Sequence, residues 1–188
     1  GIAVLGLARA QHPDLAGTRP ELFDEVALDL SDTQAVTQWL GSGALDAWLA
    51  DAGTVLLVNN AGVVQPIGPL PLQDVTTIGT AVALNVAAPL MLAAATAARR
   101  RQGADCRILH VSSGAGRHVF PGWSVYCATK AALDHHARAV VLDNTPGVRI
   151  CSLAPGVIDT DMQAEIRATG LERFPVRDFP DSDTRELA

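Results

Sequence analysis

The sequence predicts an α/β fold, a doubly wound parallel sheet in one domain at residues 1–170, followed by an irregular tail at 171–188. Short apolar segments alternate with longer helical segments along the chain, and glycine- or asparagine-rich loops follow three of the apolar segments directly. The chain has 188 residues, of which 48% are hydrophobic and 18% charged. This composition is typical of a globular domain with a sizeable core.

Five apolar segments are expected to be strands because they are short and lack helical periodicity. They lie at 2–9, 22–30, 54–58, 106–111 and 148–153. Three longer segments, at 31–50, 75–101 and 122–144, are expected to be helices, the first with a glycine interruption and with Ser31 as its N-cap. Apolar strands that alternate with helices are typical of a parallel sheet covered on both faces.

The loops that follow three of these strands predict a binding site. "NNAG" occupies 59–62, "SSGAG" 112–116 and "APGVIDT" 154–160. Ligands of open α/β sheets bind outside the carboxyl ends of the strands. Any one of these loops could be an ordinary turn, but three at the same edge indicate a shared pocket.

Tyr126 and Lys130 are the only tyrosine and the only lysine of the chain. Four residues apart on a helix, they share one face. An ammonium group beside a phenol favours the phenolate, so we expect the pKa of Tyr126 to fall below its usual value of about 10. A tyrosine tuned in this way can exchange a proton with a carbonyl or alcohol oxygen.

The charge and the cysteines exclude several classes of protein. A net charge of −6 argues against nucleic acid or an anionic membrane as the main partner. No uninterrupted apolar run reaches eighteen residues, and the first residues do not resemble an export signal. The three cysteines have neither metal-binding nor disulfide-framework spacing, so we expect no metal and a cytoplasmic location.

A set of motifs in one order resembles the short-chain dehydrogenase/reductase family. The motifs are "NNAG", "LNVAAP" around Asn85, "ILHVSSGAG", "YCATK" and the P-G-x-x-x-T run from Pro155 to Thr160. The stretch "PGVIDTDMQAEIR" further resembles the branch of sepiapterin reductases and benzil or dicarbonyl reductases. The resemblance implies a Rossmann-like fold, a homodimer or homotetramer, and hydride transfer between a nicotinamide cofactor and a small ketone or dicarbonyl.

The resemblance also implies the roles of four catalytic residues. Tyr126 would be the general acid in reduction, and Lys130 would lower the pKa of that tyrosine and bind the nicotinamide ribose. Asn85 would anchor a proton-relay water and a distortion of its helix. Ser112 and Ser113 compete for the role of orienting the carbonyl, and the family's spacing of thirteen residues before the tyrosine selects Ser113.

The cofactor residues implied by the resemblance come from several loops. The adenine would lie at Asp29 and Leu30, the adenosine ribose at Asn59, Ala61 and Gly62, and the nicotinamide at Pro155, Gly156, Ile158 and Thr160, besides Tyr126 and Lys130. Arg9 ends a strand with no acid beside it in the sequence, and a guanidinium binds phosphate bidentately. This favours NADP(H) over NAD(H).

One departure from the family pattern affects the whole interpretation. The family's central first strand, its phosphate-binding glycine loop and the helix that follows do not occur before Ile2, so we expect an N-terminally truncated piece of a longer reductase. The tail does not have the pattern of the family's last helix and strand, so we expect the last strand to be absent as well. The strands on either side of the absent first strand would then keep unpaired edges. The alternative interpretation is a non-catalytic dinucleotide-binding or assembly subunit, or an inactive fragment of a reductase.

Overall fold

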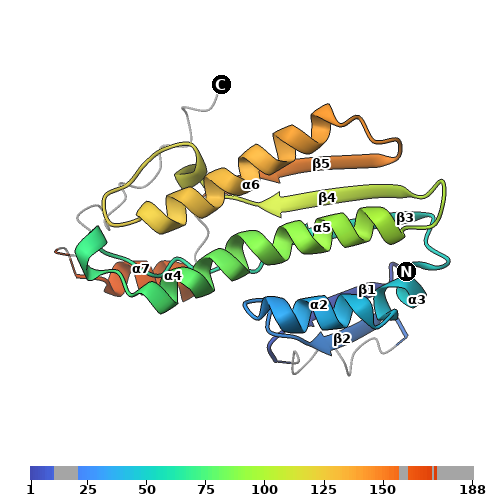
Figure 1. The fold of residues 1–188 in the computed structure, drawn as a ribbon, viewed down its shortest axis with the longest axis horizontal. Coiled ribbons are helices and arrows are strands. Elements are labelled where there is room, and N and C mark those ends of the chain that lie inside the picture. The colour runs from blue at the N-terminus through green and yellow to red at the C-terminus, as the bar shows by residue number, and fades with distance from the viewer. Residues whose placement is uncertain (11–20, 157–160, 171, 173–188) are drawn as a thin grey trace.

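The computed structural model describes residues 1–10, 21–156, 161–170 and 172, and within them five strands, all of which pair in parallel (Figure 1). The strands form two separate sheets, of orders β1-β2 and β3-β4-β5. Their bounds are β1 Val4–Ala8, β2 Phe23–Ala27, β3 Thr54–Asn59, β4 Asp105–Val111 and β5 Val148–Leu153. Each lies within or next to an expected segment, which confirms the predicted parallel α/β fold.

The helices that connect the strands also lie close to their expected ranges. They are α2 Thr33–Gly41, α3 Ala44–Leu49, α4 Val75–Val82, α5 Ala88–Arg99 and α6 Ser124–Leu142. A π-helical turn, Ala83–Ala87, joins α4 to α5, and two 3-10 turns span Leu70–Leu72 and Gly114–Gly116. The helix α7, Asp161–Ala168, was not among the elements expected from the sequence.

The first expected helix differs in its N-cap and in its continuity. Its N-cap is Asp32 and not Ser31, because the Asp32 carboxylate accepts the backbone N–H groups of Gln34 and Ala35. The Ser31 hydroxyl instead donates to Asp29, at 2.7 Å. Gly43, with a φ of 82°, separates α2 from α3 in a conformation that favours glycine.

The described helices between residues 33 and 142 lie on one side of the strands and form the core there (Figure 1). A single apolar cluster joins β2, α2, α3, β3 and α5, and it includes the fully buried Val36 and Ala88. Along β3 the side chains alternate, so Val55 is buried towards the helices while Leu56, on the other face, is 63% exposed.

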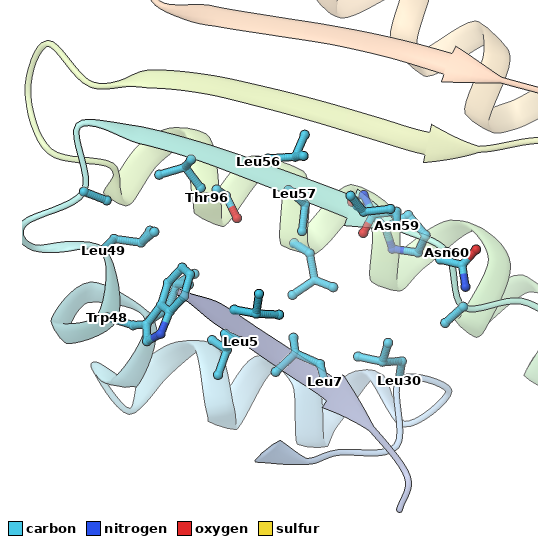
Figure 2. Close-up of a pocket in the computed structure, with 18 of the residues that line it drawn as sticks. Leu5, Leu7, Leu30, Trp48, Leu49, Leu56, Leu57, Asn59, Asn60 and Thr96 are labelled. Atoms are coloured by element: carbon cyan, nitrogen blue, oxygen red, sulfur yellow. The ribbon is translucent and has the colours of Figure 1, made fainter. Parts of the chain in front are cut away.

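An apolar cavity of about 950 Å³ lies between β1 and β3 (Figure 2). Leu5 and Leu7 of β1 line one wall, and Leu56 and Leu57 of β3 line the other. Within the described residues β1 pairs only with β2, and β3 only with β4, so one edge of each strand faces the cavity. The unpaired edges expected for these two strands are therefore present in the described part of the chain.

The helical stretch Val75–Arg99 is long and apolar enough, by composition alone, to cross a membrane. This is weak support for a span, because the core helix of a globular domain meets the same criterion. In this chain Ala88, Leu92 and Ala93 of the stretch are buried in the apolar clusters against β3 and β4.

Candidate active site

The site is built at the carboxyl ends of β3, β4 and β5, where three of the unusual loops begin. The parallel register pairs Asn59 with His110 and His110 with Ser152, so these three residues form one row across the sheet. "NNAG", "SSGAG" and "APG" start at or just after this row. The predicted convergence of the loops at one edge is therefore present.

Tyr126 lies in the first turn of α6 with only 6% of its surface exposed. Its ring packs edge-on against Trp123, with 5.2 Å between the ring centroids. Burial raises the pKa of the Tyr126 hydroxyl, while its hydrogen bond with the Ser113 side chain acts in the opposite direction. The expected fall in this pKa is thus wrong for the present structure, because desolvation of the phenolate outweighs the stabilising contacts.

Lys130 lies one turn further along the same face of α6 and is 4% exposed. Its Nζ donates a hydrogen bond to the Val111 carbonyl at 2.8 Å and lies 5.7 Å from the centre of the Tyr126 ring. Burial lowers the pKa of Lys130 to about 8. The ammonium of Lys130 is therefore easily lost just above neutral pH.

Gly62, in the loop after β3, lies close to Asn85 and Lys130. A Cβ atom on Gly62 would lie 3.2 Å from Asn85 Oδ1 and 3.6 Å from Lys130 Nζ. The first distance is tighter than most Cβ contacts, so a side chain at this position would press on Asn85.

Asn85 is 1% exposed and lies within the π-helical turn between α4 and α5. Its side chain donates to the Val63 carbonyl at 2.8 Å and accepts from the Val63 N–H at 2.9 Å. The same amide nitrogen lies 3.1 Å from Thr129 Oγ1 on α6. The helix carries the distortion expected at Asn85, and the asparagine ties the loop after β3 to the helix of Tyr126.

The two competing serines have different partners. Ser112 is buried, and its hydroxyl donates to the Lys130 carbonyl at 3.4 Å, which is a contact with the backbone of α6. Ser113 bonds to the Tyr126 hydroxyl and also accepts from the Ala115 N–H at 3.2 Å. The geometry therefore favours Ser113 as the serine that meets a substrate oxygen beside Tyr126.

The ends of β1 and β2 place Arg9 near Asp29. The backbone of Leu28 donates to the Ala8 carbonyl at 2.8 Å, which aligns the two strand ends. Hydrogen bonds from Ser31 lower the pKa of Asp29, and the charge of Arg9 lowers it further. Arg9 has no acid beside it in the sequence, but the parallel pairing of β1 with β2 brings it near Asp29, twenty residues further along the chain. Leu30 is buried in the core.

The remaining expected cofactor residues are only partly described. Asn59 is buried, Ala61 is exposed, and both lie at the edge of the cavity between β1 and β3. Pro155 and Gly156 follow β5, and Gly156 has a φ of 82°. Ile158 and Thr160 lie outside the described residues. Tyr126 and Lys130 do not line the cavity between β1 and β3. The candidate site is therefore identified by its polar side chains and not by this cavity.

A buried chain of polar side chains behind the site was not anticipated. Asn59 Nδ2 donates to the Pro89 carbonyl and lies 3.1 Å from His110 Nδ1, and His110 Nε2 lies 3.1 Å from His136 Nδ1. An amide nitrogen only donates, so His110 accepts at Nδ1 and carries its proton on Nε2. The signal in the sequence was a histidine inside the apolar run "RILHV".

The chain matches the family of short chain dehydrogenases over residues 9–170. The chain belongs to this family. The match includes the loops after β3 and β4 and the helix that carries Tyr126 and Lys130, which confirms the expected resemblance.

Individual relatives agree with the expected branch of the family. A benzil reductase that forms (S)-benzoin, from Bacillus cereus, is 35% identical over 128 residues, which are 66% of this chain and 51% of the relative. The sepiapterin reductase of Rattus norvegicus is 34% identical over 122 residues, or 63% of this chain and 46% of the relative. The chain thus spans about half the length of these curated relatives.

Solved structures agree with the fold. A short-chain dehydrogenase/reductase from Burkholderia vietnamiensis is 53% identical, with a TM-score of 0.80, and the likeness covers 99% of this chain and 88% of that one. The KRED1-Pglu enzyme is 28% identical, with a TM-score of 0.76, over 95% of this chain and 71% of that one. Both support the short-chain dehydrogenase fold for the described residues.

Proposed function

We propose that this short-chain dehydrogenase is part of an NADPH-dependent oxidoreductase that reduces a small ketone or dicarbonyl, with Tyr126 as the general acid. The single observation that carries the proposal is the cluster of the half-buried Ser113 with the buried Tyr126 and Lys130 on one edge of the sheet. Benzil and sepiapterin reductases are among the relatives, and they supply the substrate class of the proposal.

The residues of the cluster fit the nicotinamide end of a dinucleotide. Lys130 carries three N–H donors, and the Val111 carbonyl takes one of them, so the others can meet ribose hydroxyls. Gly62 presents no Cβ atom beside Nζ, where one would lie 3.6 Å from it. Tyr126 and Lys130 would therefore hold the nicotinamide ribose, while Asp29 and Leu30 would meet the adenine.

A dinucleotide held by Tyr126 and Lys130 would supply the hydride for the carbonyl carbon in the proposed reaction. Ser113 holds the carbonyl oxygen next to the phenol, and the Tyr126 O–H bond breaks as its proton passes to that oxygen. Lys130 stabilises the resulting phenolate electrostatically. Asn85 keeps the loop after β3 against α6, so that the spacing between Gly62 and Lys130 is maintained.

The choice between NADPH and NADH depends on two charges at the ends of β1 and β2. Arg9 supplies a guanidinium for a ribose 2′-phosphate, whereas Asp29 is the kind of residue that binds a 2′-hydroxyl. Asp29 already accepts two hydrogen bonds from Ser31, which occupy its Oδ1 atom. Arg9 is exposed and remains available, so we favour NADPH.

Substitution of Tyr126 by phenylalanine in the full-length protein tests the proposal. The change keeps the ring packed against Trp123 and removes only the transferable proton. We expect kcat for reduction of benzil or diacetyl to fall by about 10²–10⁴. NADPH affinity, titrated by fluorescence, should stay nearly unchanged. Retention of more than about a tenth of the wild-type kcat would rule out Tyr126 as the proton donor.

A second candidate is a chain that binds dinucleotide without catalysis. The cavity between β1 and β3 favours it, because two unpaired strand edges flank the region beside Asn59 and Ala61. The two candidates differ in one measurement. Cofactor binding with no turnover of any dicarbonyl by the full-length protein would support the second.

A further inference from the structure

The turn that carries Ser113 is joined to α6 by an ion pair. Arg117 follows the 3-10 turn Gly114–Gly116, and Ser113 is the N-cap of that turn. Arg117 Nε lies 3.5 Å from Oδ2 of Asp134 on α6. The Asp134 side chain is only 10% exposed, and the Arg117 side chain is about half exposed. The pair therefore links the segment of Ser113 to the helix that carries Tyr126.

A hydrogen bond from β5 fixes the Asp134 carboxylate on its other side. The Ser152 hydroxyl donates to Oδ1 at 2.5 Å. The buried Oδ2 accepts no hydrogen bond among the described residues, and the guanidinium of Arg117 is the charge beside it. Burying a carboxylate without a partner is costly. Exposed ion pairs contribute little to stability, but here one partner is buried, so water screens the attraction less.

The turn approaches α6 closely because residue 116 is a glycine. A Cβ atom on Gly116 would lie 2.9 Å from Asp134 Oδ2 and 3.0 Å from the Lys130 carbonyl carbon. A second tie, from Cys127 Sγ to the His118 carbonyl, is 3.8 Å long and weak, because a thiol is a poor donor. The contact at Gly116 gives the turn its place against the helix, and the ion pair is the charged contact that holds it there.

We propose that Arg117 and Asp134 are positioning residues that act through Ser113, because their ion pair holds the turn against α6 beside the tyrosine of the site. Within the turn, the Ser113 hydroxyl accepts the Ala115 N–H at 3.2 Å, and the Ser113 carbonyl accepts the Gly116 N–H at 3.0 Å. Ala115 is buried in the same apolar cluster as that tyrosine. The placement of the turn rests on these contacts, and its meaning for catalysis rests on the proposed function.

Amide hydrogen exchange tests this placement without an assay of activity. The amides of Ala115 and Gly116 report directly on the two bonds to Ser113. In the full-length protein, Arg117→Gln should speed the exchange of both amides about fivefold, the upper end of what a partly exposed ion pair contributes. The amides of β4 should exchange at the wild-type rate, because the change acts on the turn and not on the whole fold.

Three further variants complete the design. Asp134→Asn removes the charge of the other partner and can still accept from Ser152, so it should speed the same two amides equally. In the double variant the two effects should not add, because both changes remove one interaction. Arg138→Gln is the matched control and should leave the turn unchanged, since Arg138 is exposed and its Nε donates to the Asp134 backbone carbonyl, at 3.3 Å.

The outcomes separate the inference from the proposed function. Unchanged exchange of the turn in Arg117→Gln overturns the inference, and so does equally faster exchange throughout β4, because the pair would then serve the whole fold. If Asp134→Asn does not fold, the result for Arg117→Gln decides. Faster exchange of the turn with no turnover by the full-length wild type keeps the placement of the turn and rejects the reductase.

Kinetics of the full-length protein test the catalytic meaning. If the reductase proposal holds, Arg117→Gln should lower kcat for benzil about three- to tenfold, because a small displacement of Ser113 misplaces the carbonyl oxygen. The affinity for NADPH should stay unchanged, since the change does not act on Lys130. A wild-type kcat in a variant whose turn exchanges faster would reject the positioning role.

Discussion

Acidification should destabilise this protein through His110, which is fully buried near the carboxyl end of β4. In the folded state burial lowers the pKa of His110 to about 4. Its usual value is 6.5. Protonation at Nδ1 would also place an N–H against the amide nitrogen of Asn59, which donates to that atom. The folded protein therefore binds a proton at His110 much more weakly than the unfolded chain.

The sign and size of the effect follow from linkage. Because the folded pKa lies below the unfolded pKa, the stability is fully present above pH 6.5 and is lost as the pH falls towards 4. Between pH 7.5 and pH 5 the two pKa values correspond to a loss of about 2 kcal/mol in the free energy of unfolding. Most of that loss falls between pH 6.5 and pH 5.

Urea unfolding of the wild type and of His110→Asn at several pH values provides the measurement. Asparagine can still bond to Asn59 and does not titrate, so we expect the variant to lose about 2 kcal/mol less than the wild type over this range. The absolute stability of the variant is not diagnostic, because the substitution changes packing at every pH. His135→Asn, at an exposed position on α6, is the matched control. Equal slopes for wild type and His110→Asn would refute the assignment.

Three further outcomes are expected. Lys130→Arg in the full-length protein should lower kcat by about 10² or more, because a guanidinium fork cannot replace a compact ammonium. Unlike Tyr126→Phe, this variant should also bind NADPH more weakly. Wild-type kinetics for Lys130→Arg would contradict this expectation. Gly116→Ala should cost about 1–3 kcal/mol in urea unfolding, since its Cβ would contact Asp134 and Lys130, whereas Gly114→Ala in the same turn meets nothing within 4 Å and should be neutral in packing. Light scattering of the full-length protein should give the homodimer or homotetramer that the family resemblance implies, and a strict monomer at micromolar concentration would contradict this expectation.

The strands, and the sheet edge at which the three loops meet, were predictable because they depend on local sequence patterns. Apolar runs stopped by loops rich in glycine and asparagine identify buried parallel strands whatever the rest of the chain does. The N-cap was missed by one residue because Ser31 and Asp32 are both good caps. The choice between them depends on Asp29, whose carboxylate engages the hydroxyl of Ser31 and leaves the capping to Asp32.

The electrostatics were not predictable, because they depend on burial and on neighbours in space. Sequence spacing placed Tyr126 and Lys130 together, but it could not show that desolvation raises the first pKa and lowers the second. The proximity of Arg9 to Asp29 comes from the pairing of two strands and not from any local pattern.

The separation of the strands into two sheets has a consequence for how the molecule opens. Within the described residues no backbone hydrogen bond joins the β1-β2 sheet to the β3-β4-β5 sheet, and the two are joined by the apolar cluster of α2, α3 and α5. Side-chain packing of this kind can loosen without breaking a strand ladder. The backbone amides of β1 and β2 should therefore exchange with solvent through a local opening of lower free energy than the opening that exposes the amides of β4. The strand β4 is paired on both sides. The row of polar residues at the site is carried by the more slowly exchanging unit.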